Sequence, residues 1–525
     1  MIHRSPLPDV SDPDQTLTEY VLAGAAARAD KNAFVDGPSG RVLTYGELSA
    51  RVRQAARGLS DRGFGKGDVF ALFCPNCPEY AVAFHGVASL GGINTTINPL
   101  YTPKELNRQL SDAGAKLILT VPPFLDKVRE GVKGTSVDEI FVLGEAEGAT
   151  SFATLLDNDG DPPRVDIDPG TDLVALPYSS GTTGLQKGVM LSHRNLVMNV
   201  EQTLSALDGG MRESDVVMGV LPFFHIYGMV VVMSLALRAG ATVVSMPRFD
   251  LAQFLGLVQE HRATVAYLVP PIVLGLAKHP VVEKYDLSSL RWILSGAAPL
   301  GKEISAAASE RLGCLVAQAY GLTETSPASH VTPIKEDKNK PGSVGPPAPN
   351  TECRIVDVSS GQDVEPGEQG EIWIRGPQVM QGYLNNPEAT KACMDADGWF
   401  KSGDIGYADE DSYFYIVDRL KELIKYKGMQ VAPAELEALL LTHPKIADVA
   451  VVPKADDDAG EVPKAFVVVR EEISAQAIME FVAERVAPHK KIRAVEFVDR
   501  IPKSPSGKIL RRVLVEYERE NHPSG

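Results

Sequence analysis

Residues 178–188 read YSSGTTGLQKG and follow a short apolar run, DLVALP, at 172–177. The stretch gathers four Ser/Thr hydroxyls, three glycines and one lysine. Glycines let backbone N–H groups converge on an anion, hydroxyls add donors, and the lysine adds positive charge, so the stretch indicates a phosphate-binding loop. Its spacing is neither that of a Walker A loop nor that of a dinucleotide-binding GxGxxG. A flexible surface turn would explain the residue types, but not their density between two apolar strands.

Predicted helices and strands alternate on both sides of this loop. Residues 44–63 predict an amphipathic helix, because Thr44 and Glu47 have capping-box spacing and apolar residues recur at helical intervals. A second helix is expected at 81–92, and short apolar runs typical of buried strands lie at 68–75, 116–121, 242–246, 264–270 and 291–296. This alternation predicts an α/β fold with largely parallel sheets.

The pattern changes from about Gly342 onward. Shorter strands separated by Gly/Pro turns, at 352–358, 370–376 and 412–418, indicate an antiparallel or β-barrel-like subdomain. The charge-dense connector DRLKELIKYKG (418–428) then leads into a compact α+β unit of roughly 100 residues, a normal domain size. We therefore predict an N-terminal domain over 1–418 and a C-terminal domain over 419–525.

Composition restricts the class of partner and the compartment. The 525 residues carry a formal charge of −16, which argues against nucleic acid or an anionic membrane as the main partner. Five scattered cysteines fit a reducing compartment, and the N-terminus lacks an apolar signal-peptide core, so we expect a cytoplasmic protein. The 22 residues between Asp215 and Arg238 carry no Asp, Glu, Lys or Arg, but Pro222, His225 and two glycines interrupt them. We interpret this stretch as a buried strand, a loop and a core helix instead of a membrane span.

Several further motifs accompany the loop in a fixed order: PFFHIYG (222–228), SGAAPLG (295–301), QAYGLTETSP (318–327), GEIWIRGPQVMQGYL (370–384), GWFKSGDIGY (398–407), DRLKELIKYKGMQVAPAELE (418–437) and PKSPSGKILRR (502–512). With them the chain resembles the acyl-adenylate-forming superfamily over nearly its whole length, and within it most resembles the 4-coumarate:CoA ligases. One departure is Gln186, where the family usually has proline. The resemblance implies a large domain of two α/β sheets plus a β-barrel-like subdomain, and a small mobile C-terminal α+β domain that turns about a hinge at Lys421.

The resemblance also implies a role for individual residues. The ATP phosphates would be held by Ser179, Ser180, Gly181, Thr182, Thr183, Gly184 and Lys187, with Mg²⁺ on Glu324. The AMP part would be surrounded by Ala297, Gln318, Ala319, Tyr320, Thr323, Asp404 and Arg419. Lys508 would bridge the acyl carboxylate and the α-phosphate, and His225 would help to position them; Lys508, His225, Thr323 and Glu324 form the implied catalytic set. This reaction joins a carboxylate to a phosphate, both of them anions. Neutralising their charge and aligning the attacking and leaving oxygens should therefore contribute most to catalysis.

The connector and the acyl pocket complete the implied site. Lys425 and Gln430 match residues that contact the adenylate, whereas Lys427 and Gly428 match the coenzyme A contact. The acyl pocket would be lined by His225, Tyr227, Gly228, Val231, Ala297 and Gly321. This lining is apolar and contains no Lys or Arg, which favours a monocarboxylic acid. A 4-coumarate- or cinnamate-type acid is the first expectation.

Several alternatives stay open at this point. The same walls suit a medium-chain fatty acid. The adenylate could instead be loaded onto a carrier protein or oxidised in a luciferase-like reaction. A protein that binds nucleotide without catalysis is a third class, disfavoured because Lys187, Glu324, Asp404 and Lys508 are all present.

Overall fold

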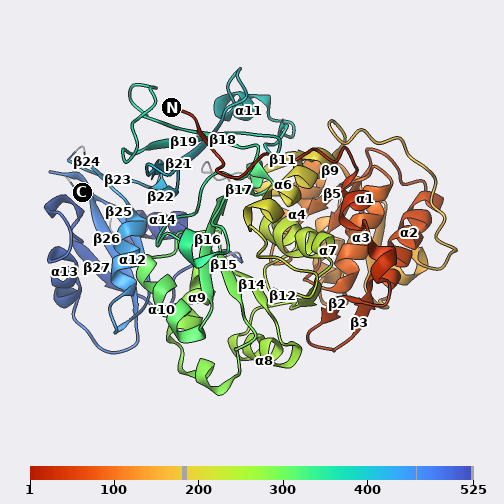
Figure 1. Ribbon diagram of the computed structural model, residues 1–525, viewed down its shortest axis with the longest axis horizontal. Helices are drawn as coiled ribbons and strands as arrows, with labels where there is room; N and C mark the ends of the chain where they lie inside the picture. The colour runs from red at the N-terminus through yellow and green to blue at the C-terminus, as the bar shows by residue number, and fades with distance from the viewer. Residues whose placement is uncertain (180–185, 428, 457, 506, 522–525) are drawn as a thin grey trace.

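The computed structural model describes residues 1–179, 186–427, 429–456, 458–505 and 507–521. Its first α/β sheet contains the strands that flank the glycine-rich loop (Figure 1). Its strand order is β10 (Tyr178–Ser179), β11 (Lys187–Ser192), β9 (Leu173–Ala175), β5 (Ile93–Thr96), β4 (Val69–Leu72), β6 (Ala115–Thr120), β7 (Glu139–Val142) and β8 (Thr150–Ser151), with β20 (Gly382–Tyr383) paired to β11. Strands β4 to β9 pair in parallel, whereas β11 pairs antiparallel with β9, β10 and β20. The predicted parallel α/β arrangement is confirmed for this sheet.

A second α/β sheet lies beside the first. Its strand order is β17 (Ala328–Val331), β16 (Leu315–Gly321), β15 (Trp292–Ser295), β14 (Val265–Leu268), β12 (Val216–Gly219), β13 (Thr242–Ser245), β2 (Asn32–Asp36) and β3 (Val42–Thr44). The inner strands are parallel, and the end pairs β16–β17 and β2–β3 are antiparallel. Because β16 ends at Gly321, the QAYGLTE motif leaves the sheet at the carboxyl edge of its parallel strands, where ligands commonly bind in open α/β sheets.

Helices cover these sheets, and several of them begin at a residue whose side chain caps the helix. The helix expected at 44–63 is α2 (Tyr45–Asp61), whose N-cap Thr44 accepts from Glu47 N while the Glu47 side chain accepts from Thr44 N. The remaining helices of the N-terminal domain are α1 (Leu17–Val21), α3 (Pro78–Ser89), α4 (Pro103–Ala113), α5 (Leu125–Gly131), α6 (His193–Ala206), α7 (Leu235–Ala239), α8 (Leu251–His261), α9 (Pro270–Lys278), α10 (Lys302–Leu312) and α11 (Pro387–Cys393). Short 3-10 turns occupy Ala25–Arg28, Pro122–Phe124, Phe152–Leu155, Pro280–Lys284, Thr323–Thr325, Glu336–Lys338 and Pro488–Lys490.

The uncharged stretch 216–237 is internal. It forms strand β12, a loop, the π-helix η4 (Tyr227–Ser234) and α7, and every residue of η4 is buried. This confirms the expected strand, loop and core helix, although the π-helical winding was not anticipated. Within the described ranges, no helix combines the length and hydropathy that crossing a membrane requires. All five cysteines are free thiols.

The Gly/Pro-rich region forms the expected antiparallel subdomain. Its strands run in the order β1 (His3–Arg4), β18 (Glu352–Val356), β19 (Gly370–Arg375), β21 (Phe400–Ala408) and β22 (Phe414–Arg419). The first strand comes from the N-terminus, which therefore lies beside β18 in Figure 1. Strand β22 ends at Arg419, next to the predicted domain boundary.

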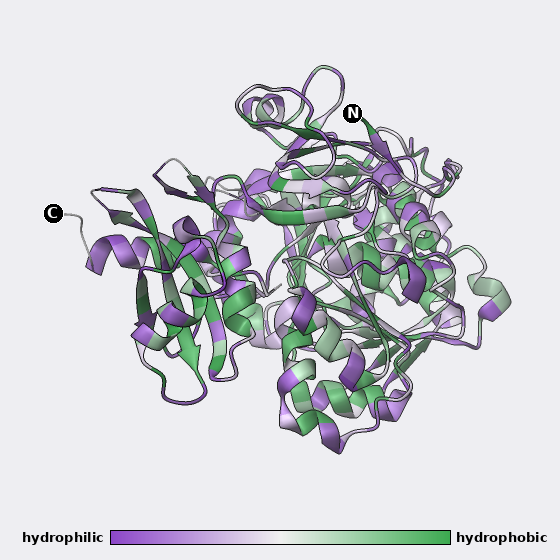
Figure 2. Cartoon of the chain, turned by 60° about the vertical axis from the view of Figure 1, so that its left-hand side comes forward, coloured by the Kyte–Doolittle hydropathy of each residue, from purple (hydrophilic) through white to green (hydrophobic). Residues whose placement is uncertain are grey.

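The C-terminal region has its own sheet and its own core. Strands β24 (Met429–Val431), β23 (Ile424–Tyr426), β26 (Gly460–Val469), β25 (Ile446–Asp456) and β27 (Ala494–Phe497) pack against α12 (Pro433–Leu441), α13 (Ala475–Ala483) and α14 (Arg511–Asn521). Apolar side chains of these elements form clusters separate from the large N-terminal core. Figure 2 shows this unit standing to one side of the larger body, with apolar strands inside and polar residues outside.

Candidate active site

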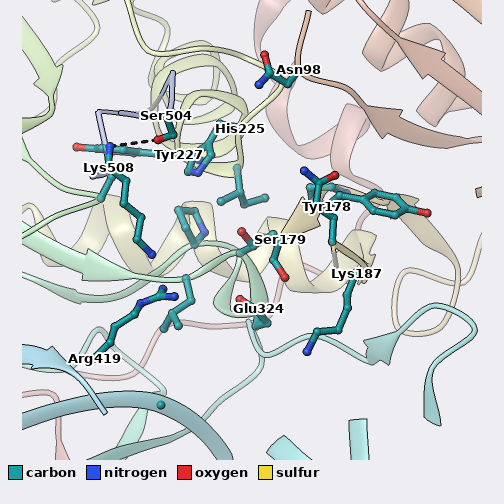
Figure 3. Close-up of a pocket in the computed structure, with 18 of the residues that line it drawn as sticks. Asn98, Tyr178, Ser179, Lys187, His225, Tyr227, Glu324, Arg419, Ser504 and Lys508 are labelled. Carbon is teal, nitrogen blue, oxygen red and sulfur yellow. Dashed lines mark hydrogen bonds between the residues drawn. The ribbon is translucent and has the colours of Figure 1, made fainter. Parts of the chain in front are cut away.

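A cavity of about 2280 Å³ collects most of the residues implied by the motifs. Its walls come from both α/β sheets, from the antiparallel subdomain and from the C-terminal unit. Those of its lining residues that the sequence had singled out are Ser179, Lys187, His225, Tyr227, Val231, Ala297, Ala319, Tyr320, Gly321, Thr323, Glu324, Arg419, Lys421 and Lys508. Segments more than 300 residues apart in the chain therefore line the same cavity (Figure 3).

One side of the cavity carries Ser179 and Lys187, from the two strands that flank the glycine-rich loop, and a buried carboxylate. Ser179 Oγ is buried and has no hydrogen-bond partner within the described part of the chain, so it remains available as a donor. Glu324 is 8% exposed and accepts a hydrogen bond of 2.8 Å from the Tyr383 hydroxyl. The Lys187 ammonium lies 4.3 Å from the centre of the Tyr383 ring. Tyr383 thus orients both the carboxylate and the lysine, a role that its place in the motif at 370–384 did not indicate.

His225 is held as a neutral imidazole. Burial lowers its pKa to about 4, and the nearby positive charge of Lys508 adds to this effect. Its Nδ1 accepts the backbone N–H of Tyr227 at 3.3 Å, which leaves the ring proton on Nε2. His225 can therefore donate one hydrogen bond to an anion in the cavity at neutral pH.

A buried hydrogen-bonded group forms the opposite wall. Asp404 and Arg419 are register partners on β21 and β22, with Arg419 Nε 3.4 Å from Asp404 Oδ1. The Tyr320 hydroxyl donates to Asp404 Oδ2 at 2.6 Å. Burial raises the pKa of Asp404, against the opposing effect of Arg419 and Tyr320. Arg419 and Tyr320 line the cavity, whereas Asp404 lies behind them with further acceptor capacity on its oxygens.

Lys508 reaches this site from the C-terminal unit. Its loop closes on itself, because Lys508 N donates to Ser504 Oγ at 3.1 Å and Ser504 N donates to Lys508 O at 2.8 Å. From this loop the side chain extends toward Arg419 (Figure 3). Burial lowers the pKa of Lys508 to about 8; the positive charge of Arg419 contributes, and Glu422 and Asp404 oppose the shift. Lys508 of the C-terminal unit and Arg419, the last residue of β22 at the predicted domain boundary, thus face the same cavity.

The apolar end of the cavity contains Tyr227, Val231, Ala297 and Gly321. The Tyr227 hydroxyl donates to Leu294 O at 2.9 Å, so the ring forms a fixed wall. Ala297 has φ +70°, a left-handed conformation that costs a non-glycine residue free energy and often marks a functional site.

Gly228 does not line the cavity with its expected neighbours. A Cβ at Gly228 would lie 2.0 Å from Pro222 O, so the residue permits a close backbone contact and does not provide space for a ligand. Gly321 does line the cavity. It also permits a close backbone contact, because a Cβ there would lie 2.0 Å from Pro327 O. Gln318, also expected near AMP, is buried and accepts from Leu300 N at 3.3 Å, so it supports the wall from behind.

The connector residues expected to contact the adenylate, Lys425 and Gln430, and coenzyme A, Lys427, lie elsewhere. Lys425, Lys427 and Gln430 are exposed on the β23–β24 hairpin and do not line the large cavity. Lys425 and Gln430 are cross-strand partners in that hairpin. The structure therefore presents the Lys508 face of the small domain to the cavity, with the hairpin turned away. Ser180, Gly181, Thr182, Thr183, Gly184 and Gly428 lie outside the described residues.

The departure at Gln186 has a local consequence. Its side-chain amide donates to the Tyr101 hydroxyl, and both residues line the cavity. A proline at this position would lack that donor. This chain thus ties the end of its glycine-rich loop to the segment before α4.

A cavity that combines Lys187 beside the glycine-rich loop, the buried Glu324 carboxylate and Lys508 from the C-terminal unit has the charges that an enzyme acting on a nucleotide needs. The model of the AMP-binding enzyme family matches residues 22–384, and that of the AMP-binding enzyme C-terminal domain matches residues 435–508. This chain belongs to the AMP-binding enzyme family.

Individual relatives cover nearly the whole chain. The 4-coumarate–CoA ligase 5 of Oryza sativa subsp. japonica is 47% identical over 528 residues, which span 98% of this chain and 96% of that protein. The 4-coumarate–CoA ligase of Pinus taeda is 45% identical over 530 residues, spanning 98% and 97%. Among solved structures, the anthranilate CoA ligase AuaEII in complex with anthranoyl-AMP superimposes with a TM-score of 0.90 at 26% identity, covering 97% of this chain and 98% of that chain. The resemblance inferred from the motifs is confirmed.

Proposed function

We propose that this chain is an ATP-dependent acid:CoA ligase that forms an acyl-adenylate and then an acyl-CoA thioester. The observation that carries the proposal is the entry of Lys508 into a cavity already lined by Arg419, His225 and Glu324. Full-length relatives named as CoA ligases support the same reaction.

In the first half-reaction a carboxylate oxygen of the acid attacks the α-phosphorus of ATP, and the bond to pyrophosphate breaks. Negative charge grows on the α-phosphate oxygens, so fixed positive charge and N–H donors stabilise the transition state. Lys508 and Arg419 supply the charge, and His225, a neutral imidazole at neutral pH, supplies an Nε2–H donor. Lys187 faces the pyrophosphate, and Tyr383 beneath it restricts its direction.

Mg²⁺ is the expected metal, with Glu324 as its protein ligand. No group of three His, Cys, Asp or Glu side chains in the described chain forms a ready-made metal site. A single buried carboxylate fits Mg²⁺ nonetheless, because this ion commonly takes one or two carboxylates and completes its shell with phosphate oxygens and water. When bound, the ion would neutralise charge on the ATP phosphates, while Tyr383 keeps the Glu324 oxygens directed to it.

In the second half-reaction the CoA thiolate attacks the acyl carbonyl, and AMP leaves. We place Lys427 and Gly428 at the contact with coenzyme A in this step, and Lys425 and Gln430 at the contact with the adenylate. Their exposed hairpin would reach the cavity if the C-terminal domain, 419–525, turned about Lys421 and withdrew Lys508. The two lysine sets thus serve separate half-reactions from separate faces of one domain.

The acid is best matched by a flat aromatic monocarboxylate of the 4-coumarate or cinnamate type. The fixed Tyr227 ring and the small or apolar Val231, Ala297 and Gly321 suit a planar group. The named activity of the rice and pine relatives agrees with this assignment. A medium-chain fatty acid is the second candidate, because the same walls are apolar throughout.

A substrate panel tests the function directly. Pyrophosphate release is measured with cinnamic, 4-coumaric and octanoic acids, each with and without CoA. We expect acid-dependent release with the two aromatic acids and a thioester product only when CoA is present. Silence with every acid would refute the ligase, and adenylate without thioester would indicate a carrier protein or another acceptor.

The rate of the first half-reaction is expected to fall at alkaline pH. Burial lowers the Lys508 pKa to about 8, and the ammonium is the form that neutralises the phosphate. The protonated fraction falls as pH rises through that value, so kcat/KM for ATP should decline by about tenfold per unit above pH ~8. Transfer from supplied acyl-AMP is the control, because the thiolate content of CoA increases over the same range. A flat adenylation profile up to pH ~10 would contradict the assignment.

A further inference from the structure

Helix α12 begins without a cap from its own chain segment, because its N-cap residue Ala432 has no side-chain acceptor. A carboxylate from the other domain takes this place: Ala434 N donates to Asp418 Oδ2 at 2.8 Å. Asp418 belongs to β22, before the connector, whereas α12 lies after it. The helix cap therefore crosses the predicted domain boundary.

The surroundings of Asp418 make this contact specific. Asp418 is 5% exposed, and its Oδ1 accepts from Arg419 N at 2.7 Å, so both carboxylate oxygens have backbone partners. An anionic side chain at a helix N-terminus is favoured by the exposed N–H groups and by the helix dipole. Beside it, Ile405, Leu423 and Ala432 form a small buried apolar cluster between the antiparallel sheet and the small domain.

The same contact is linked to the Lys508 loop through Arg511. The Arg511 guanidinium pairs with Glu437 of α12 at 2.6 Å and with Glu422 of the connector. Its positive charge also faces Asp418 and opposes the rise that burial causes in the Asp418 pKa. Because Arg511 lies three positions after Lys508, these ion pairs connect the segment that carries Lys508 to α12 and to the connector.

We propose that Asp418 is a positioning residue for the first half-reaction: by capping α12 across the domain boundary, it holds the C-terminal domain where Lys508 enters the cavity. This inference rests on the proposed function and on rotation about Lys421, which must separate Asp418 from Ala434. Breaking the cap then favours the other orientation of the small domain.

The test separates the two half-reactions in Asp418→Ala. We expect adenylate formation, measured by pyrophosphate exchange, to slow about tenfold. Loss of a helix cap changes an equilibrium constant by a factor of roughly 2 to 30. Transfer from supplied acyl-AMP to CoA should be unchanged or faster. Asp418→Asn retains an oxygen acceptor without the charge and should show a smaller loss of adenylation.

Two controls distinguish positioning from simple helix stability. Asp250 caps α8 within the large domain, its Oδ1 accepting from Gln253 N at 2.9 Å, so Asp250→Ala should leave the ratio of the half-reactions unchanged. In the double variant Asp418→Ala/Ala432→Ser, α12 regains a cap from its own chain but not the contact between domains. Its adenylation should stay slow. Full recovery in the double variant, or equal loss of both half-reactions in Asp418→Ala, would overturn the inference.

Domain orientation can also be measured without any acid substrate. Spin labels at the exposed positions Glu260 on α8 and Glu484 after α13 report the distance between the two domains. Asp418→Ala should broaden or shift the distance distribution of the wild type. An unchanged distribution would refute the positioning role, whereas inactivity of the wild type with every acid would refute only the proposed function.

Discussion

Replacing Lys508 with alanine is expected to slow acyl-adenylate formation by about 10²–10³-fold, the usual loss when one preorganised donor to a developing oxyanion is removed. The Lys508 side chain is half-buried in the cavity that Arg419 and His225 also line, and its partial desolvation lowers its pKa, so water replaces its charge poorly. Thioester formation from supplied acyl-AMP and CoA should retain most of its rate, because the small domain presents its other face for that step. Pyrophosphate exchange and acyl-CoA formation measure the two steps separately.

Lys503 provides the matched control for this variant. It lies in the same loop and lines the same cavity, but its ammonium is paired with Asp448 at 2.6 Å. Lys503→Ala should leave adenylation within about threefold of the wild type, since a partly exposed ion pair contributes little. If Lys508→Ala reduces both half-reactions equally, the model in which the two faces alternate is wrong.

Replacing Asp404 with alanine is expected to raise the KM for ATP by about 100-fold. We expect the two ribose hydroxyls to donate to this carboxylate, and hydrogen bonds to a charged group contribute about 1.5–3 kcal/mol each. Removing the Asp404 carboxylate also leaves Arg419 and the Tyr320 hydroxyl without their buried partner, so we expect their positions in the cavity wall to change. Asp404→Asn keeps one acceptor oxygen and should raise KM by only about tenfold.

Asp409 serves as the control carboxylate for Asp404. It follows the same strand, β21, but its carboxylate pairs with Lys340 at 2.7 Å instead of with the cavity-lining Arg419 and Tyr320. Asp409→Ala should leave the KM for ATP unchanged, as measured by pyrophosphate release at varied ATP. A KM for ATP in Asp404→Ala that matches the wild type would exclude the ribose contact.

Local signals in the sequence predicted much of the fold. Thr44 and Glu47 marked the start of α2, and the β-branched runs marked β4, β6, β13, β14 and β15, because capping and burial periodicity depend on near neighbours. The π-helical winding of η4 was not predictable from periodicity, since an unbroken apolar run carries no helical phase.

Some members of the candidate site were also predictable from local motifs, and others were not. Ordered motifs identified Lys187, His225, Glu324, Arg419 and Lys508 as members of one site, and the cavity brings them together. Tyr383 was missed although it stood inside a quoted motif, because its value lies in contacts with Glu324 and Lys187, far away in the chain. Gly228 is not among the lining residues: the motif identifies a glycine, but only the backbone of Pro222 shows why a glycine is needed there.

The sequence by itself determined the α/β class, the order of the motifs and the kinds of charge that an adenylate-forming site needs. These follow from residue type and spacing, which are properties of neighbouring positions. Only the tertiary structure decided which face of the small domain meets the cavity and that Asp418 caps a helix of the other domain. Such contacts join residues on separate rigid units, and their free energy depends on how the units dock, which no local pattern encodes.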